Sequence, residues 1–396
     1  MSPAQMQPAS HSSASRLKMR DLFILAGEAS GDRIGANLIA GLKAQLNVEV
    51  SGVGGEAMAA EGLRTLFPIE DLAVMGYVDV LRRLPLLLWR ARQTVQTILR
   101  NRPDAVVLVD AQVFSHTVAR ALRRKGYDKP IILYVAPSVW AWKPERAAKI
   151  AQLYNEVLSV LPFEPQVMAD LGGPRTSYVG HPALARFPMR QIQPRRGPIV
   201  LLPGSRAGEL TRHLPLMRAV STALANHSAV DGFAIPTPEN LKGKVTRAVA
   251  DWPASVTVTS DEAERRAAMD AAILAFAVSG TATLELALAG VPHIVTYVAE
   301  GAQVRLYQKA LIKTIGLPNI IAQREIVPEI LFAHKPEPER AVGALTRLLE
   351  DEAERRAQCA AFATIRGLME KGAPDAPLSD PAERVSFWLE RGSSAH

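Results

Sequence analysis

The chain is 396 residues long with 48% hydrophobic and 21% charged residues, a composition typical of a globular protein with two or three domains. Its 46 Lys and Arg exceed its 39 Asp and Glu and leave a net charge of +7, which suits anionic ligands, a membrane surface or ordinary surface charge and does not indicate nucleic acid. The single cysteine, Cys359, excludes an internal disulfide and is typical of a reducing compartment, and no apolar run approaches the ~18 residues of a membrane-spanning helix.

Residues 1–20 are rich in Ser, Ala and Pro and lack the apolar segment of a secretory signal, so they predict a disordered leader. After it, short apolar runs alternate with segments of helical spacing such as 34–45 and 118–125. The runs that predict buried parallel strands are 22–26, 105–109, 131–135 and 157–161. This alternation predicts a doubly wound α/β domain over residues 21–186.

Residues 186–198 combine Pro, Arg and Gln without periodicity, as an interdomain linker does. The alternation then resumes and predicts a second α/β domain over residues 197–369. Its predicted strands are 199–202, 233–235, 256–258, 271–276 and 293–297. Residues 370–396 form a tail that ends in a short helix at 381–391, which either returns to the first domain or is exchanged with a partner chain in a homodimer.

Two such domains joined by one linker form a cleft, and ligands of open parallel sheets bind outside the carboxyl ends of the strands. The first candidate loop, GEASGDRIGA at 27–36, has small residues that permit a close approach to its backbone. Its glycines do not follow the dinucleotide pattern G-x-G-x-x-G, which disfavours a nicotinamide or flavin cofactor. Glu28 and Asp32 are candidate site residues, with N-capping of the following helix as the alternative.

Asp110 opens the second candidate loop, in VVLVDAQVFS, directly after a predicted buried strand. A carboxylate at the carboxyl end of such a strand faces the cleft, where partial desolvation raises its pKa towards that of a useful general base. A helix N-cap is the competing role.

A third candidate site is the turn Gly204-Ser205-Arg206, in LLPGSRAGELTRHLP, between an apolar strand and a helix. Backbone N–H groups at the helix start and the Arg206 guanidinium can together hold an anion such as phosphate. An ordinary strand-to-helix turn is the alternative, because so short a motif has a high false-positive rate.

A similar turn occurs in VSGTATLELALAG, residues 278–290. Ser279 and Thr281 can donate to a second phosphate or sugar group, although helix capping explains both equally well. Capping does not explain Glu285, which lies one turn into an otherwise apolar helix and can accept hydrogen bonds from vicinal hydroxyls.

Seven short segments along the chain carry a family resemblance. They are GEASGD at 27–32, SVWAW at 138–142, LPFE at 161–164, VGHP at 179–182, LPGSR at 202–206, SGTATLE at 279–285 and LPN at 317–319. In their order, the chain resembles bacterial lipid-A-disaccharide synthase over about residues 20–370. The resemblance implies a GT-B fold, with two Rossmann-like domains facing a cleft. It also implies inverting transfer of 2,3-diacylglucosamine from its UDP derivative to 2,3-diacylglucosamine 1-phosphate, with release of UDP.

The resemblance also implies roles for individual residues. Asp110 resembles the family's proposed base for the acceptor hydroxyl, and Arg206 stabilises the leaving UDP. The implied donor-binding residues are Gly204, Ser205 and Arg206 at the diphosphate, Ser279, Gly280 and Thr281 at a second turn, Glu285 at the ribose and Asn319 on the nucleotide side. The candidate acceptor and cleft residues are Glu28, Ser30, Gly31, Asp32, Met75 and His181. No metal or other cofactor is expected, and the sequence has no Asp-x-Asp pair to hold a metal against a diphosphate.

One loop departs from the family pattern. Where the family usually reads Asp-Ala-Pro-Asp-Phe, this chain reads Asp-Ala-Gln-Val-Phe at 110–114, so Gln112 and Val113 replace the proline and the second aspartate. The change loosens the loop, removes a structural hydrogen bond, alters the acceptor site or marks a paralogue of different specificity.

Residues 75–92, MGYVDVLRRLPLLLWRAR, combine an apolar run with flanking arginines. This pattern predicts a surface that dips into an anionic membrane to collect acylated substrates, with a buried core helix as the alternative. The predicted location is therefore the cytoplasm, with peripheral association at the inner membrane. Trp140 and Trp142 either line a sugar or acyl groove or pack inside, and His181 either binds a ligand or is structural.

Two alternatives to the transferase stay open. A nucleotide-sugar epimerase can share the architecture, but it requires further acidic or His groups acting on the donor sugar, of which the sequence offers few. A non-catalytic protein or paralogue of altered specificity that binds a UDP-sugar is the second alternative, and the intact Asp110 argues against loss of catalysis.

Overall fold

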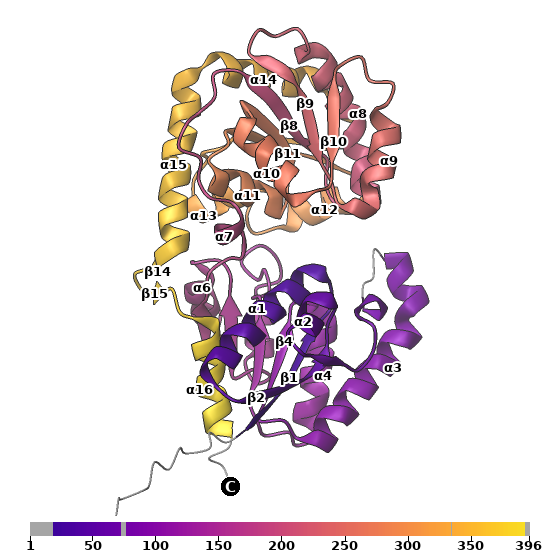
Figure 1. The fold of residues 1–396 in the computed structure, drawn as a ribbon, viewed down its shortest axis with the longest axis vertical. Coiled ribbons are helices and arrows are strands. Elements are labelled where there is room, and N and C mark those ends of the chain that lie inside the picture. The colour runs from indigo at the N-terminus through magenta and orange to yellow at the C-terminus, as the bar shows by residue number, and fades with distance from the viewer. Residues whose placement is uncertain (1–18, 73–76, 334, 393–396) are drawn as a thin grey trace, which may run out of the picture. The chain divides into compact units, whose positions relative to one another are not determined.

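The structure of the protein is a computed structural model that describes residues 19–72, 77–333 and 335–392. Its strands are β1 (Arg20–Ala26), β2 (Val48–Val53), β3 (Arg64–Thr65), β4 (Ala105–Val109), β5 (Ile131–Tyr134), β6 (Glu156–Ser159), β7 (Thr176–Tyr178), β8 (Gly197–Leu202), β9 (Val230–Pro236), β10 (Val256–Thr259), β11 (Leu274–Val278), β12 (His293–Ala299), β13 (Glu329–Ala333), β14 (Gly372–Ala373) and β15 (Ala376–Pro377). They form a seven-stranded sheet in the order β3-β2-β1-β4-β5-β6-β7, a six-stranded sheet in the order β10-β9-β8-β11-β12-β13, and the small pair β14-β15. Figure 1 labels β1, β2 and β4 of the first sheet, β8 to β11 of the second, and the pair β14-β15.

Helices connect most of these strands, as the predicted alternation requires. They are α1 (Ala29–Gln45), α2 (Glu56–Ala60), α3 (Tyr77–Asn101), α4 (Gln112–Arg124), α5 (Arg146–Ile150), α6 (Glu164–Asp170), α7 (Ala183–Arg186), α8 (Ala207–Leu224), α9 (Glu239–Val249), α10 (Glu262–Ala271), α11 (Thr281–Ala289), α12 (Ala302–Lys309), α13 (Leu317–Ala322), α14 (Pro338–Glu350), α15 (Glu352–Lys371) and α16 (Pro381–Gly392), with a 3₁₀ turn at Ile69–Asp71.

Each large sheet has one point where the strand order reverses. In the first sheet the reversal lies between β1 and β4, which pair in parallel with Ala26 opposite Val109. In the second sheet it lies between β8 and β11, where Leu202 is opposite Ala277. The structure therefore confirms two doubly wound α/β sheets, and such reversal points are where these folds bind ligands.

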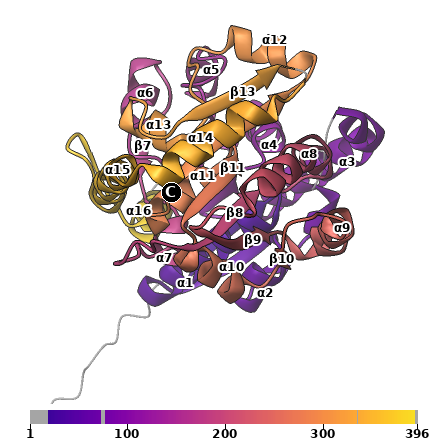
Figure 2. The ribbon, with the colours of Figure 1, turned by 90° about the horizontal axis from the view of Figure 1, so that it is seen from above.

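The central strands are apolar because both faces of each sheet are covered. Every residue of β4 and of β11 is buried, as expected for parallel strands between two helical layers. On one face of the second sheet, α8, α9 and α14 contribute to a single core, and Figure 2 shows α8 and α14 side by side. A separate cluster joins α11 and α15 through Ala287 and Phe362.

Contacts divide the chain into two compact units. The first contains the described residues up to Val135, Gln152–Glu156 and the helix α16, and the second contains Ala136–Ala151 and Val157–Ser379. The last helix therefore belongs to the first unit, where it lies against α1 and β4. Arg384 donates to both oxygens of Glu156 at 2.9 Å, and the Trp388 indole donates to the same carboxylate at 2.5 Å. Across the described residues, no helix is both long and apolar enough to cross a bilayer.

Candidate functional site

The first reversal point carries unusual backbone conformations. Asp110 and Ala111, directly after β4, have φ of +50° and +45°, and Val135, directly after the neighbouring β5, has φ of +76°. Left-handed conformations are unfavourable for residues with a Cβ and most of all for β-branched ones. Such strained residues cluster at functional sites, where the surrounding structure must hold them in place.

Backbone hydrogen bonds hold Asp110 in place, and its surroundings shift the pKa of its side chain. Its amide donates to the Tyr134 carbonyl at 2.8 Å, and its carbonyl accepts a 2.7 Å hydrogen bond from the Ser115 hydroxyl. Burial raises the pKa of the Asp110 carboxyl, the nearby Glu28 carboxylate raises it further, and a hydrogen bond from the Ala111 amide lowers it. The raised pKa makes Asp110 a stronger base than an exposed carboxylate, which is the property predicted for it.

The loop after β1 lies directly beside the Asp110 loop. A Cβ on Gly27 would lie only 2.6 Å from the Cβ of Ala111, so the two loops can approach only because residue 27 is glycine. Gly31 packs at the same place, where a Cβ would be 3.3 Å from the Cβ of Ala26. The exposed Ser30 hydroxyl donates to Glu28 at 2.7 Å. Glu28, Ser30 and Asp110 therefore lie together at the carboxyl ends of the central strands β1 and β4.

Asp32 has a role that its position in the sequence does not reveal. The helix α1 begins after Glu28, which places Asp32 inside the first turn, so its interpretation as the N-cap of α1 is wrong. Its carboxylate is 6% exposed and accepts hydrogen bonds from the amides of Gly55, Ala57 and Met58 at 2.7, 2.9 and 3.1 Å. Asp32 therefore holds the start of α2, and its oxygens are engaged within the fold.

The two departures from the family pattern differ in their surroundings. The Gln112 amide nitrogen donates to the carbonyl of the strained Val135 at 3.1 Å, and its buried Oε1 has no hydrogen-bond partner among the described residues. Gln112 thus links the start of α4 to the end of β5. The Val113 side chain is 82% exposed, so the aspartate it replaces would stand in solvent, and its loss leaves no buried gap.

Two further acceptor-side predictions have different outcomes. Met75 lies outside the described residues. His181 Nδ1 accepts a 3.1 Å hydrogen bond from the Ala183 amide, at the start of α7. Burial, assisted by the Arg186 charge, lowers the pKa of His181 to about 4. The ring is therefore neutral at pH 7 with its proton on Nε2, and the bond to α7 supports the structural interpretation of this residue.

At the second reversal point, the turn after β8 already holds an anion supplied by the chain. Gly204 has φ of +106°, and a Cβ there would lie 2.4 Å from Glu209 Oε2. That oxygen accepts hydrogen bonds from the amides of Ser205 and Arg206 at 2.9 and 3.2 Å, and Arg206 Nη1 lies 3.2 Å from Oε1. The amides expected to be free are thus paired with a carboxylate. The sequence did carry a signal for this pairing, because a Glu three residues after a helix N-cap, here Glu209 after Arg206, is typical of a capping box.

His213 supports the same helix from inside. It is fully buried, its Nδ1 donates to the Glu209 carbonyl at 2.8 Å, and its Nε2 accepts from the Val298 amide at 3.0 Å. Because Nε2 accepts, the ring is neutral, and burial lowers its pKa accordingly. His213 ties α8 to β12 and so positions the Gly204–Arg206 turn.

The second turn, after β11, neighbours the first because β8 and β11 pair. The Ser279 hydroxyl donates to the Ile315 carbonyl at 2.6 Å, so it serves the fold. Gly280, with φ of +148°, and Thr281 are exposed at the start of α11. Further along α11, the Glu285 side chain is ion-paired with Arg265 and lies 3.9 Å from Arg186 Nη1.

Asn319 does not offer its side chain to a ligand. It is 2% exposed, its Nδ2 donates to Val327 O and Glu329 Oε1 at 2.8 and 2.7 Å, and its Oδ1 accepts from the amides of Ile326 and Val327 at 2.8 and 2.9 Å. Its two donors and both acceptor positions are therefore used. Glu329, which sequence reasoning missed, also accepts from the amide of Gly316 at 2.9 Å. Glu329 holds the loop before α13 and Asn319 holds the segment after it, a correction to the predicted nucleotide contact of the Asn319 side chain.

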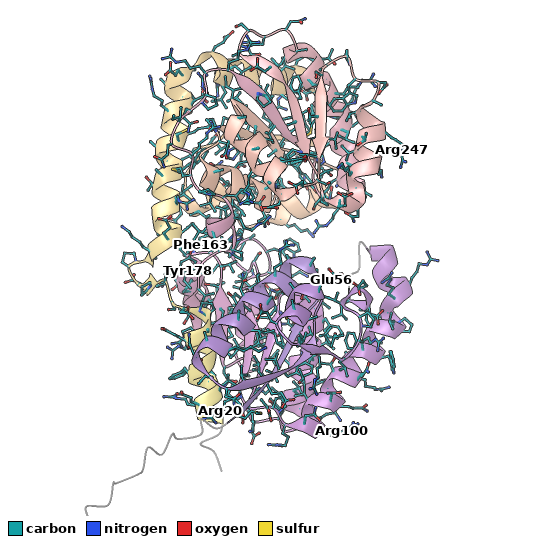
Figure 3. All side chains as sticks on the ribbon, in the orientation of Figure 1. Arg20, Glu56, Arg100, Phe163, Tyr178 and Arg247 are labelled. Atoms are coloured by element: carbon teal, nitrogen blue, oxygen red, sulfur yellow. The ribbon has the colours of Figure 1, made fainter. Side chains whose placement is uncertain are left out.

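The buried carboxyl group of Glu164 connects two of the family-like segments, SVWAW at 138–142 and LPFE at 161–164. The Trp140 indole donates to Glu164 at 3.2 Å and packs edge-on against Phe163, with ring centroids 5.4 Å apart. Burial raises the pKa of Glu164 to about 7. The Tyr178 hydroxyl donates to the Met369 carbonyl at 2.5 Å, and Figure 3 marks Phe163 and Tyr178. These two contacts hold the half-buried Trp140 in place.

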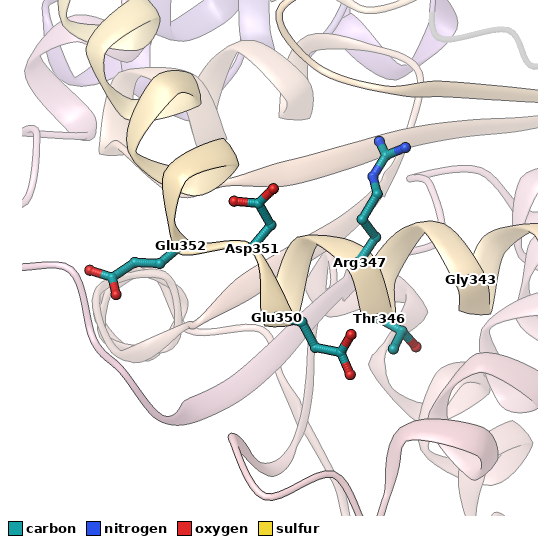
Figure 4. A pocket seen from close by; sticks show the side chains of 6 residues that line it. All are labelled: Gly343, Thr346, Arg347, Glu350, Asp351 and Glu352. Carbon is teal, nitrogen blue, oxygen red and sulfur yellow. The ribbon is translucent and has the colours of Figure 1, made fainter.

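A surface cavity of about 610 Å³ lies where α14 meets α15 (Figure 4). Its lining residues are Gly343, Thr346, Arg347, Glu350, Asp351 and Glu352. None of the predicted site residues lines it. Among the residues described, no group of three or more His, Cys, Asp and Glu is arranged to hold a metal ion.

Comparisons with known proteins agree on one family. Residues 22–376 match the family model of Lipid-A-disaccharide synthetase. The chain is 38% identical over 384 residues to the Lipid-A-disaccharide synthase of Bradyrhizobium diazoefficiens, covering 94% of this chain and 97% of that protein.

Solved structures of low sequence identity share the fold. The calicheamicin glycosyltransferase CalG4 matches with a TM-score of 0.58 at 16% identity, covering 95% of this chain and 99% of that one. UDP-GlcNAc 2-epimerase from Neisseria meningitidis, bound to UDP-GlcNAc, matches with a TM-score of 0.58 at 11% identity, covering 94% and 99%. The fold is GT-B, and it occurs in both enzyme classes, so the family assignment rests on the sequence matches. The chain belongs to the lipid-A-disaccharide synthase family, the glycosyltransferases of lipid A biosynthesis.

Proposed function

We propose that the protein transfers 2,3-diacylglucosamine from its UDP derivative to 2,3-diacylglucosamine 1-phosphate, with inversion at the anomeric carbon and release of UDP. The observation that carries this proposal is Asp110, a carboxylate of raised pKa on a strained backbone at the first reversal point. Residues 21–186 bind the acceptor in this proposal, and residues 197–369 bind the UDP-sugar.

Asp110 acts as the general base. Its carboxylate takes the proton of the acceptor hydroxyl while that oxygen forms a bond to C1 of the donor sugar. The bond from C1 to the UDP oxygen breaks in the same displacement, so the configuration at C1 inverts. The raised pKa of the Asp110 carboxyl favours proton transfer from a hydroxyl.

The turn after β8 stabilises the leaving diphosphate. Its donors are the amides of Ser205 and Arg206 and the Arg206 guanidinium, whose side chain is 69% exposed. Glu209 gives up its bonds to these amides when the diphosphate binds, because two anions cannot share them. The exposed Gly280 and Thr281 contribute a second set of donors, and Glu285 accepts from the ribose.

We also propose that the protein is cytoplasmic and associates peripherally with the inner membrane. The helix α3 exposes Leu84, Leu88 and Trp89 by 42, 56 and 54%. The exposed Arg82 and Arg92 on the same helix flank this group, whereas Arg90 is ion-paired with Asp71. An exposed apolar group beside a cation is suited to the interface of an anionic bilayer, where the acyl chains of both substrates reside.

Acceptor-dependent release of UDP tests the proposed function. The purified protein is given UDP-2,3-diacylglucosamine in detergent micelles, with and without 2,3-diacylglucosamine 1-phosphate, and the anomeric configuration of the product is read by NMR. We expect UDP release only with the acceptor, and a β-linked disaccharide. A folded, UDP-binding protein that releases no UDP with this acceptor would overturn the substrate assignment, and an α-linked product would overturn inversion.

A further inference from the structure

Glu285 is a charged group in an apolar setting. It lies on α11, whose residues from Thr283 to Ala289 are all buried, and it is 7% exposed. Burial disfavours an ionised carboxylate unless a cation compensates for the lost hydration. Whatever Glu285 does with a ligand therefore depends on the arginines that face it.

The two arginines near Glu285 are not equivalent. Arg186 is engaged with another residue, because its Nη2 lies 2.9 Å from both oxygens of Glu262 and its Nη1 reaches Glu285 Oε1 only at 3.9 Å. Arg265 instead donates directly to Glu285 Oε2 through Nη2. Arg265 is thus the principal partner. Among the described residues, Oε1 has only the long contact with Arg186, so its hydrogen-bonding capacity remains.

Arg265 is held in place from two sides. It lies in the first turn of α10, where Asp261 caps the helix and the Arg265 amide donates to the Asp261 carbonyl at 2.9 Å. Its guanidinium lies over the buried Phe187 ring at 5.4 Å, and Arg186 lies over the same ring at 5.2 Å. These contacts restrict the orientation of the guanidinium.

Arg265 is oriented so that its Nη2 reaches Glu285 while its Nε is left without a hydrogen bond to any described residue. Arg265 Nε is buried and has no hydrogen-bond partner within the described part of the chain. A buried unpaired N–H is unfavourable, and such groups in native structures call for an explanation. Alignment of Nη2 with the carboxylate of Glu285 provides one.

We propose that Arg265 is a positioning residue for recognition of the donor ribose. By binding Oε2, Arg265 holds the Glu285 carboxylate turned so that Oε1 accepts a hydrogen bond from a ribose hydroxyl of a uridine diphosphate. This inference rests on the proposed function, because it requires a nucleoside diphosphate at the second reversal point. It deepens that proposal by naming the residue on which ribose recognition depends.

The test compares the dissociation constants of UDP and 2′,3′-dideoxy-UDP by calorimetry. A hydrogen bond to a charged carboxylate makes wild type bind UDP about 10- to 100-fold more tightly than the dideoxy compound. Arg265→Met brings this ratio to within about threefold of one, and Arg265→Lys restores part of it by returning the charge. The matched control is Arg266→Met, an exposed arginine next along α10, which keeps the wild-type ratio.

The outcomes distinguish a failure of the ribose role of Glu285 from a failure of the positioning role of Arg265. A wild-type ratio near one would overturn the ribose role of Glu285 under the proposed function, and this inference with it. A high ratio that persists in Arg265→Met would overturn this inference alone. If Arg265→Met does not fold, Arg265→Gln replaces it with the same expected loss. In the double variant Arg265→Met/Glu285→Gln, the ratio should equal that of Glu285→Gln, since both changes remove one interaction.

Discussion

The Glu209 carboxylate accepts a 2.9 Å hydrogen bond from the Ser205 amide, so the turn after β8 binds an anion from its own chain. The same oxygen, Oε2, also accepts a hydrogen bond from the Arg206 amide at 3.2 Å. A donor diphosphate that uses these amides must displace the carboxylate, which makes Glu209 a competitor of UDP as well as a helix cap.

Replacing Glu209 should therefore separate binding from stability. Glu209→Gln can keep the capping hydrogen bonds but loses the charge, so we expect UDP to bind about fivefold more tightly. Glu209→Ala also loses the cap, and its free energy of unfolding should fall by about 1 kcal/mol. Calorimetry and urea unfolding measure these effects, with Glu239→Gln in the first turn of α9 as the control. Weaker UDP binding by Glu209→Gln would show that Glu209 is a structural cap alone.

The anchoring of α16 gives a prediction about stability. Glu156 is fully buried and accepts two hydrogen bonds from Arg384. Arg384→Met leaves this buried carboxylate without that charge, and we expect a loss of about 3 kcal/mol in the free energy of unfolding. The exposed Arg391 on the same helix provides the control Arg391→Met, with a change below about 0.5 kcal/mol. Equal effects of the two variants in urea unfolding would contradict the anchoring role.

The buried His293 predicts a loss of stability in acid. Burial lowers the pKa of His293 to about 4, whereas an exposed histidine titrates near 6.5. Below pH 6.5 the unfolded chain binds a proton that the folded chain refuses, so this contribution is fully present above pH 6.5 and is lost as the pH falls towards 4. The difference in unfolding free energy between wild type and His293→Gln should shrink by about 3 kcal/mol across this range. If the difference in unfolding free energy between the two proteins did not change with pH, the contribution of His293 would be refuted.

The exposed apolar residues of α3 predict binding to membranes. Leu88→Ser with Trp89→Ser should reduce co-sedimentation with vesicles of phosphatidylethanolamine and phosphatidylglycerol at least tenfold, without a change in melting temperature. Val113→Ser, which changes an 82% exposed apolar residue elsewhere in the same unit, is the control and should bind vesicles as wild type does. Undiminished vesicle binding by the double variant would assign the membrane contact to another surface.

The sequence predicted the central strands of both sheets because their signal is local, but it did not predict β2, β3, β7 or β13. Apolar runs marked β4 at 105–109 without error, and the predicted 381–391 helix became α16. The run 271–276 was placed too early relative to β11, Leu274–Val278, because its alanines suit a helix end and a strand equally. Predictions of this kind depend on neighbours a few residues apart.

The parts of the site that escaped prediction depend on distant partners. Asp32 caps a helix that begins at Glu56, and Glu285 pairs with Arg265 from another helix. The left-handed conformations of Ala111 and Val135 carry no signal either, since neither residue prefers them. Residue type and strand ends indicated the candidate site, but contacts across the fold decide which of its residues have side chains without partners in the fold.

The most direct test of the account is the acceptor-dependent rate of UDP release by Asp110→Asn, a variant that keeps the shape of the side chain and removes the base. Glu49→Gln, an exposed carboxylate on β2, is the matched control. We expect a fall of about 10²- to 10⁴-fold for Asp110→Asn, with UDP affinity unchanged. The wild-type rate should decline as the pH drops through the raised pKa of Asp110, because the protonated carboxyl cannot accept a proton. A rate for Asp110→Asn within threefold of wild type would contradict the assignment of Asp110 as the base.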